Sequence, residues 1–206
     1  MAGAERQKAP PLPAGNVNAN PSDISFWALV AEDFRTQDSK ILAQGFWVLF
    51  WHRFGNWRMS VRSRVLRAPL SVIYNVMFKA CEVFCGCKLS YPVTVGRRVR
   101  IDHFGGMIFG ARSIGSDVIL RQNTTLGVLS TDDLNAKPMI GDRCDIGAGA
   151  VILGHVRIGP DAVVGANAVV LKDVPPHHLA VGVPARIIPR RGGPADDRAS
   201  AADAAE

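Results

Sequence analysis

The residues best suited to acid–base chemistry are adjacent, Asp102 and His103, and two glycines follow at Gly105 and Gly106. An imidazole is largely neutral at pH 7, so it can accept a proton from a hydroxyl group. A carboxylate beside it can bind or orient the molecule that carries the hydroxyl. The alternative interpretation is a corner residue without a catalytic role, and the Asp-His-x-Gly-Gly context favours the general base.

Three cysteines raise the question of a metal site, since Cys81, Cys85 and Cys87 stand close together. Cys81 and Cys85 would lie one turn apart on a helix. The sequence has no Cys-x-x-Cys pair and no nearby histidine to complete a tetrahedral set of ligands. It therefore predicts buried thiols and no metal.

The element that must position these residues is a repeat of six, which begins near residue 95. Its most regular part is Ile140, Ile146, Ile152, Ile158, Val164 and Val170. The same register extends backward through Val95, Ile101, Ile108, Ile114, Leu120 and Leu126. It needs one extra residue between 101 and 108 and two between 126 and 140, where a loop can leave the body.

A period of six fits neither a helix nor an alternating strand, and it predicts a parallel β-helix. Six residues make one short strand and a corner, and three such sides close a triangular coil. The aliphatic residue points inward and stacks on the coils above and below. Glycine tolerates the backbone angles of the corners.

The first ninety residues lack this repeat and predict helices. We expect one helix to begin at Pro21-Ser22 with Ser22 as N-cap, and a second at Asp38-Ser39 leading into 41–57. A third should open at Pro69 and end at Gly86. Its packed face is predicted to be Leu70, Ile73, Met77, Cys81 and Phe84.

Aromatic and basic residues are concentrated in the second predicted helix and just after it. The rings are Phe46, Trp47, Phe50, Trp51, Phe54 and Trp57. They fit an interfacial membrane helix, a base-stacking site or the core of a small helical cap, and the pattern favours the cap. The arginines are Arg53, Arg58, Arg62, Arg64 and Arg67. They predict either a solvated face or contact with an anionic membrane or another subunit.

Composition excludes several classes of protein. The 206 residues are 48% hydrophobic and 20% charged, which excludes a wholly disordered chain. The apolar runs 41–51 and 68–78 are too short to span a membrane. The net charge of +6 is concentrated in the first ninety residues without a nucleic-acid-binding module, so nucleic acid is not an expected partner. A start without an apolar core and four cysteines predict a cytoplasmic protein, with the inner face of the membrane as an alternative.

Five stretches carry a resemblance to a known family. They are HRFGNW (52–57), RIDHFGGMIFGARSIG (100–115), QNTTLG (122–127), IGAGAVILG (146–154) and IGANAVVLKDVPPHHLAVGVPARII (164–188). Together they resemble the serine O-acetyltransferase branch of the hexapeptide-repeat acyltransferases over roughly residues 24–190. The resemblance implies a mainly β fold, a left-handed parallel β-helix with a small N-terminal α-helical cap, and a homotrimer. Left-handed coiling is an exception to the usual crossover rule.

We expect five segments along the chain. They are a disordered start at 1–21, the helical cap at 22–90, the β-helix at 91–175, a C-terminal extension at 176–191 and a disordered tail at 192–206.

The resemblance also implies a reaction, the transfer of an acetyl group from acetyl-CoA to a hydroxyl. His103 would be the general base, and Asp102 would help to bind or orient the acceptor. CoA would lie in the groove between neighbouring prisms, with Lys172 and Arg186 near its phosphates. The other residues implied for CoA are Gly127, Ala148, Gly149, Ala166 and Asn167.

Departures from the family pattern all concern the acceptor. No carboxylate occupies Lys88–Pro92, where the family carries the aspartate that orients its histidine. Ala136-Lys137 stands where the family has an Arg-His pair, whose arginine grips the carboxylate of serine, and Lys137 offers only a point charge in its place. Asp38 partly matches an acceptor-binding aspartate of the cap. The acceptor is therefore L-serine by resemblance, or a sugar such as an exopolysaccharide precursor, which the missing arginine favours. A basic aromatic cap would suit the membrane surface, and the alternative function is an inactive scaffold or membrane-surface interaction protein.

Overall fold

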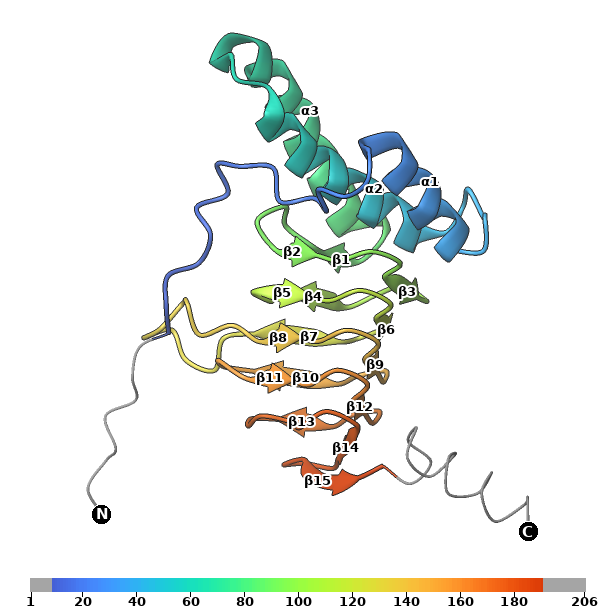
Figure 1. Ribbon diagram of the computed structural model, residues 1–206, viewed down its shortest axis with the longest axis vertical. Coiled ribbons are helices and arrows are strands. Elements are labelled where there is room, and N and C mark those ends of the chain that lie inside the picture. The colour runs from blue at the N-terminus through green and yellow to red at the C-terminus, as the bar shows by residue number, and fades with distance from the viewer. Residues whose placement is uncertain (1–8, 191–206) are drawn as a thin grey trace.

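The computed structural model describes residues 9–190 as helices standing on a triangular prism of short strands (Figure 1). The helices are α1 (Phe26–Thr36), α2 (Gln44–Trp57) and α3 (Arg64–Phe84), with a 3₁₀ turn at Arg58–Ser60. Residues 1–8 and 191–206 lie outside the described part of the chain. The predicted disordered tail at 192–206 and the first eight residues of the predicted disordered start at 1–21 therefore lie outside it. The predicted architecture, a β-helix with an N-terminal helical cap, is confirmed.

Three sheets form the sides of the prism. Sheet A contains β1 (Cys87–Lys88), β4 (Met107–Phe109), β7 (Thr125–Gly127), β10 (Val151–Leu153) and β13 (Val169–Val170). Sheet B contains β2 (Thr94–Val95), β5 (Ser113–Ile114), β8 (Met139–Ile140) and β11 (Arg157–Ile158). Sheet C contains β3 (Arg100–Asp102), β6 (Ile119–Arg121), β9 (Asp145–Ile146), β12 (Val163–Val164), β14 (His178–Val181) and β15 (Arg186–Pro189).

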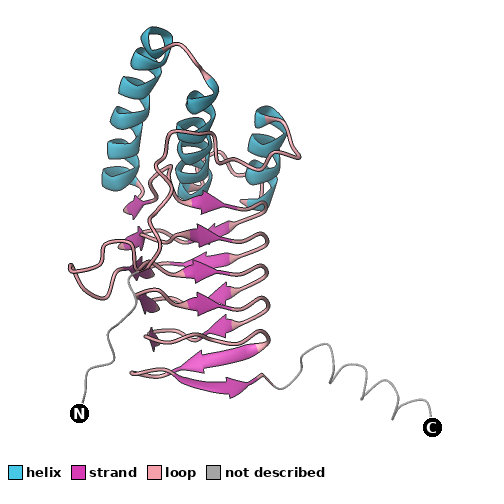
Figure 2. Ribbon diagram, turned by 60° about the vertical axis from the view of Figure 1, so that its left-hand side comes forward, coloured by secondary structure: helices cyan, strands magenta, loops and turns pink. Residues whose placement is uncertain are grey.

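The chain visits the three sheets in turn, so that consecutive coils stack in parallel (Figure 2). The prism ends in the antiparallel pair β14–β15. Three edges run along the prism. The histidine edge (103–106, 122–124, 147–150, 165–168) joins sheet C to sheet A. The loop edge (110–112, 128–138, 154–156, 171–173) joins A to B, and the charged edge (96–99, 115–118, 141–144, 159–162) joins B to C.

The inward register of the repeat is confirmed at Val95, at Ile101 and from Ile114 onward, where the stacked aliphatic side chains are buried. One position of the predicted register is wrong. Ile108 is 48% exposed, whereas Phe109 is buried and pairs with Leu126. Eight residues therefore separate the inward Ile101 from the inward Phe109, where a regular side takes six. The extra residues lie in the corner that carries His103.

The second irregularity of the repeat marks a loop, as predicted. Residues 128–138 leave the prism at the loop edge (Figures 1 and 2). The N-terminal residues 9–20 form neither helix nor strand, and they run beside the prism to this loop. The Ala9 amide donates to Asp133 at 2.9 Å, and Arg112 donates to the carbonyls of Pro11 and Asn135, both at 3.0 Å.

The first two helices begin later than predicted. The N-cap of α1 is Ser25, whose hydroxyl accepts from the amide of Ala28, and not Ser22. Asp38 and Ser39 do not begin α2, because both adopt left-handed backbone angles, with φ near +57° and +54°, in the turn after α1. A residue in that conformation cannot start a right-handed helix.

The third helix begins earlier than predicted and packs on a different face. Ser63 caps α3, and Pro69 lies inside the helix. Tyr74 and Cys81 are buried against the rest of the molecule, whereas Ile73 and Phe84, which we expected to be packed, are exposed. The exposed apolar side chains of α3 are Val65, Leu66, Val72, Ile73, Val76, Val83 and Phe84. They leave one side of α3 without an apolar partner among residues 9–190.

Polar side chains of α2 satisfy the open end of the prism. The first coil has no coil above it, so its carbonyl groups need other donors. Asn56 donates to the carbonyl of Tyr91 and His52 to that of Val93, both at 2.9 Å. Arg53 donates to the carbonyls of Val95 at 2.7 Å and Gly96 at 2.6 Å. The stretch HRFGNW therefore joins the cap to the β-helix.

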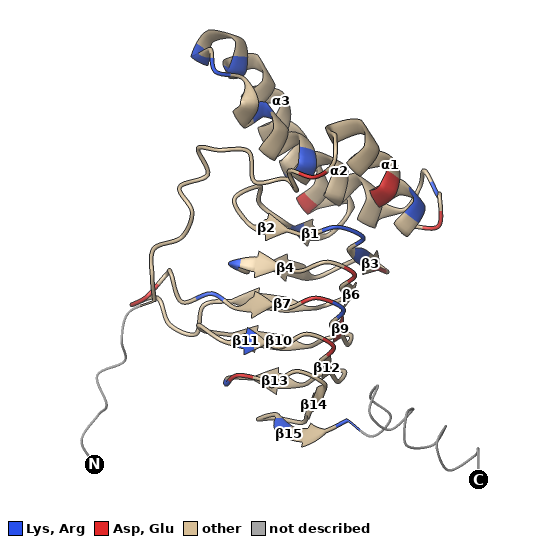
Figure 3. Cartoon of the chain, in the orientation of Figure 1, with Lys and Arg blue, Asp and Glu red and all other residues tan. Residues whose placement is uncertain are grey.

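Two of the five clustered arginines belong to neither of the predicted surfaces. Arg53 is fully buried, and its Nε lies 2.9 Å from Asp33 Oδ2. The guanidinium of Arg58 lies 4.4 and 4.2 Å from the ring centroids of Tyr74 and Tyr91. Lys and Arg residues do occur at the outer end of α3 (Figure 3).

The aromatic rings of α2 pack on one another along the helix. Only Phe46 of the six is buried, and Trp47 and Trp51 pack against the core while partly exposed, so the prediction that these rings form the core of the cap is only partly confirmed. Trp47 and Phe50, then Phe50 and Trp51, then Trp51 and Phe54 meet edge to face at 5.0–5.8 Å between centroids. Phe46 also contacts Phe34 of α1. These contacts are the offset geometries that aromatic rings prefer.

We expect His52 to make the fold sensitive to acid. Burial lowers the pKa of His52 to about 3, and its Nε2–H donates to Val93. The unfolded chain therefore binds this proton first as the pH falls, so the stabilisation is complete above about pH 6.5 and is lost towards pH 3. His52 alone should lower the free energy of unfolding by about 1.4 kcal/mol per pH unit in that window.

Urea denaturation at several pH values, at one protein concentration, tests this expectation against His52→Gln. Glutamine keeps a donor for Val93 but does not titrate. An equal pH dependence in both proteins would contradict the expected role of His52.

Candidate functional site

A cavity of about 210 Å³ opens beside His103 where the cap meets the prism. Asp38 reaches it from the turn after α1, and Asp102 and His103 reach it from the end of β3. Its remaining lining residues are Gln37, Lys40, Ala43, Gln44, Gly45, Arg100 and Ile101. Asp38, Asp102 and His103, which the sequence predicted for catalysis and acceptor binding, thus line one cavity within a single chain.

Gly45 allows the close approach of α2 to β3 that forms this cavity. A Cβ at this position would lie only 2.7 Å from the carbonyl oxygen of Ile101. Any larger residue would push the start of α2 away from the strand that carries Asp102.

His103 stands on the enlarged corner after β3. Its backbone is left-handed, with φ +62°, and its side chain is exposed. Gly105 and Gly106 complete the corner with φ +109° and +64°, which explains why two glycines follow the histidine. Across residues 9–190 no group hydrogen-bonds to the imidazole ring, so the ring can turn towards a bound hydroxyl.

Arg100 holds both acidic residues of the cavity, and the sequence prediction missed it. Its Nη1 and Nη2 donate to the two oxygens of Asp38 at 2.7 and 2.8 Å, and its Nε donates to Asp102 at 2.5 Å. The hydrogen bonds from Arg100, with a further one from Lys40, lower the pKa of Asp38 to about 2. Strand alternation was the available signal, because Arg100 and Asp102 flank the inward Ile101 and so share the outer face of β3.

Four of the residues predicted for CoA share the histidine edge with His103. The amide of Asn123 donates to Gly105, that of Gly149 to Gln122 and that of Asn167 to Ala148, at 3.0, 2.9 and 2.8 Å. This ladder places Ala148, Gly149, Ala166 and Asn167 on successive coils below His103. Gly149 has φ +70°, and a Cβ there would lie 2.2 Å from Asn167 Oδ1, so a larger residue at this corner would have to displace the Asn167 side chain.

The other predicted residues lie elsewhere on the prism. Gly127 ends β7, and Lys172 follows β13 at the loop edge. Lys137 lies in the loop at that edge, in a cavity of about 240 Å³ that Leu12 and Arg112 also line. Arg186 begins β15 in the last hairpin. Within one chain, therefore, His103 and Lys137 are separated by sheet A, because they stand on its two opposite edges.

Known proteins resemble this chain in sequence and in structure. The family model for bacterial transferase hexapeptide (six repeats) matches residues 137–172. The serine acetyltransferase of Mycobacterium tuberculosis is 36% identical over 152 residues, 71% of this chain and 63% of that protein. The enzyme of Escherichia coli K12 is 34% identical over 191 residues, 88% of this chain and 66% of that protein.

Structural similarity covers the cap as well as the prism. Soybean serine acetyltransferase apoenzyme matches with a TM-score of 0.67 and 30% identity, over 80% of this chain and 69% of that one. The chain belongs to the serine acetyltransferase-like branch of the hexapeptide-repeat acyltransferases. It spans just under two thirds of the length of the two curated relatives.

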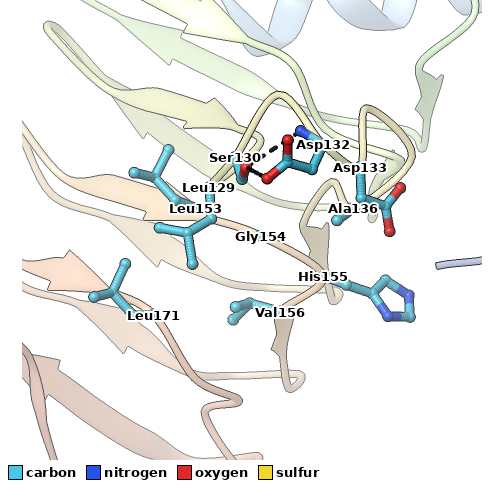
Figure 4. A pocket seen from close by; sticks show the side chains of 10 residues that line it. All are labelled: Leu129, Ser130, Asp132, Asp133, Ala136, Leu153, Gly154, His155, Val156 and Leu171. Atoms are coloured by element: carbon cyan, nitrogen blue, oxygen red, sulfur yellow. Dashed lines mark hydrogen bonds between the residues drawn. The ribbon is translucent and has the colours of Figure 1, made fainter. Parts of the chain in front are cut away.

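A larger cavity, of about 450 Å³, lies under the loop of this acyltransferase-family chain. Leu129, Leu153 and Leu171 line one side, and His155 projects on the other (Figure 4). Its other lining residues are Ser130, Asp132, Asp133, Ala136, Gly154 and Val156. The sequence did not identify this cavity, although the break in the repeat between 126 and 140 marked the loop that covers it.

The cysteines of this family member are buried and free. They are Cys81, Cys85, Cys87 and Cys144. Within residues 9–190 no group of three or more histidine, cysteine or acidic side chains is placed to hold a metal ion. In the same part of the chain, no helix has the length and apolar character needed to cross a membrane.

Proposed function

We propose that the protein is an acetyl-CoA-dependent O-acetyltransferase in which His103 is the general base. The observation that carries the proposal is the cavity that joins His103, Asp102 and Asp38. Similar solved structures support it. They include soybean serine acetyltransferase complexed with serine, at 28% identity and a TM-score of 0.67, and a serine acetyltransferase in complex with CoA, at 28% and 0.64.

In the proposed reaction the acceptor hydroxyl attacks the carbonyl carbon of the acetyl thioester. The new bond joins the hydroxyl oxygen to the acetyl carbon, and the bond that breaks joins that carbon to the sulfur of CoA. An imidazole nitrogen of His103 takes the hydroxyl proton during attack and returns it to the departing thiolate, which leaves as CoA thiol. Asp102 orients the acceptor beside the imidazole.

CoA is proposed to lie along the histidine edge. The residues proposed there (Ala148, Gly149, Ala166 and Asn167) are partly or fully exposed, and three of the four are small, which leaves room for an extended ligand. A donor that follows this edge brings its thioester to the corner of His103. Lys172 and Arg186, both exposed, are the cations proposed for its phosphates, with Lys172 supplied by the loop edge of a neighbouring prism.

We also propose a homotrimer with sites between subunits. His103 and Lys137 stand on opposite edges of sheet A, so only a neighbouring prism can bring a second loop edge to the histidine edge. Light scattering in solution should give a mass three times that of the chain.

We also propose contact with an anionic membrane through α3 and its start. Arg62 and Arg64 are exposed there, next to the apolar side chains of α3 described above. Co-sedimentation with vesicles that contain phosphatidylserine, compared with phosphatidylcholine alone, tests it.

The experiment for the main proposal follows release of CoA thiol from acetyl-CoA, with L-serine and with neutral sugars as acceptors. We expect acceptor-dependent release and an acceptor heavier by one acetyl group in mass spectrometry. Absence of acetyl-CoA binding in calorimetry, together with no release with any acceptor, would refute the proposed function.

A further inference from the structure

The acidic side chains of the cavity beside His103 are already paired with a cation. Arg100 donates two hydrogen bonds to Asp38 and one to Asp102, and another to the carbonyl of Thr36 at 3.1 Å. Lys40 lies 3.4 Å from Asp38 as a second cation. Two negative and two positive groups therefore line the cavity, and their charges cancel.

This arrangement disfavours an acceptor that carries an ammonium group. An ammonium ion that loses water needs a carboxylate to compensate it. Both carboxylates here face the guanidinium of Arg100, so an incoming ammonium would meet a like charge or would have to displace Arg100. The bidentate pair with Asp38 is the kind that holds an arginine most firmly.

A neutral acceptor with several hydroxyls fits the same groups without displacing them. Each carboxylate oxygen has a second lone pair that can accept from a hydroxyl. Arg100 and the amide of Gln44, which also lines the cavity, can donate to hydroxyl oxygens. His103 at the rim can then take the proton of one hydroxyl in the array.

We propose that Arg100 determines the acceptor class, by pairing with Asp38 and Asp102 so that the site selects a neutral polyhydroxyl, a sugar, over an ammonium-bearing hydroxyl such as serine. This inference rests on the O-acetyltransferase function proposed above. Arg100 is a specificity-determining residue, and His103 remains the base whichever acceptor is bound.

The experiment compares two acceptors that differ in one group, glycerol and serinol (2-amino-1,3-propanediol), at pH 7, where the amine is protonated. Wild type, Arg100→Met and Arg143→Met are assayed with both, and also with L-serine and methyl glucopyranosides. Arg143→Met is the matched control, because Arg143 also pairs with an aspartate, Asp161, but on the charged edge. Melting temperatures and acetyl-CoA affinities of all three are measured in parallel.

We expect wild type to prefer glycerol and the glucopyranosides. Freed carboxylates in Arg100→Met should raise kcat/KM for serinol, relative to glycerol, by about 10- to 100-fold, the worth of one charge-assisted hydrogen bond. Arg143→Met should keep the wild-type ratio. If Arg100→Met unfolds, Arg100→Gln takes its place, and its ratio of kcat/KM for serinol to that for glycerol is compared with the wild-type ratio.

Three results would overturn the inference. Wild type that prefers serinol, or that uses L-serine at sub-millimolar KM, refutes it while the acetyltransferase function stands. So does an unchanged ratio in folded Arg100 variants that still bind acetyl-CoA. If the wild-type protein neither binds nor turns over acetyl-CoA, the proposed function is refuted, and the inference with it.

Discussion

Replacement of His103 by asparagine should lower kcat for acetyl transfer by about 10²- to 10⁴-fold, the usual contribution of a general base. The imidazole is exposed at the mouth of the cavity, next to Asp102. Asparagine tolerates the left-handed backbone at this corner, so the fold should not change. The rate of CoA release at saturating acetyl-CoA measures the effect.

His177→Asn is the matched control for this variant. His177 is also exposed and left-handed, with φ +58°, but it stands just before β14, beside Asp161 of the charged edge. Its replacement should leave kcat within about two-fold, because surface changes away from a site have small effects. A folded His103→Asn protein with wild-type kcat would exclude His103 as the base. If the wild-type protein has no acetyl-CoA-dependent activity with any acceptor, the scaffold interpretation is favoured.

Replacement of Arg53 by methionine should cost about 3–5 kcal/mol of folding free energy, because it leaves a buried charge without its partner. Asp33 and Arg53 are both fully buried, and burial raises the pKa of the Asp33 carboxyl while its partner opposes that shift. The change also removes donors to Val95 and Gly96 at the open end of the prism. Guanidinium denaturation followed by tryptophan fluorescence measures the loss.

Arg143→Met provides the comparison on the surface. Its ion pair with Asp161 is exposed, and such pairs contribute about 0–1 kcal/mol. The double replacement Asp33→Leu with Arg53→Met should recover part of the loss, since no unpaired charge remains. Equal, small losses in Arg53→Met and Arg143→Met would show that the buried pair does not hold the cap on the prism. All proteins are compared at one concentration, because assembly also contributes to stability.

The repeat is the feature that sequence reasoning could recover most completely. Inward residues such as Ile146 and Val164 recur at fixed spacing, and a side chain that stacks on the next coil must be aliphatic at every turn. The register was wrong only at Ile108. There the two residues on either side, Met107 and Phe109, are also apolar, so spacing alone could not show that these two are buried and Ile108 is exposed.

Charges were harder to interpret than apolar spacing. The sequence shows Arg53 and Arg58 among five arginines, and nothing local distinguishes them from Arg62 or Arg64. Arg53 is buried because Asp33, twenty residues earlier, and the end of the prism both face it. Burial of an arginine depends on partners brought by other elements.

The candidate site shows the same division. Asp102 and His103 adjoin each other in the chain, and their glycine-rich corner is a local pattern, so the sequence alone identified them. Arg100 acquires its role from Asp38, which is 62 positions away and reaches it only when the cap docks on β3. The sequence by itself determined the β-helix and the position of the corner that carries His103, because periodicity and turn chemistry are local properties. Only the tertiary structure decided which charges are paired around that corner, because ion pairs depend on how separate elements pack.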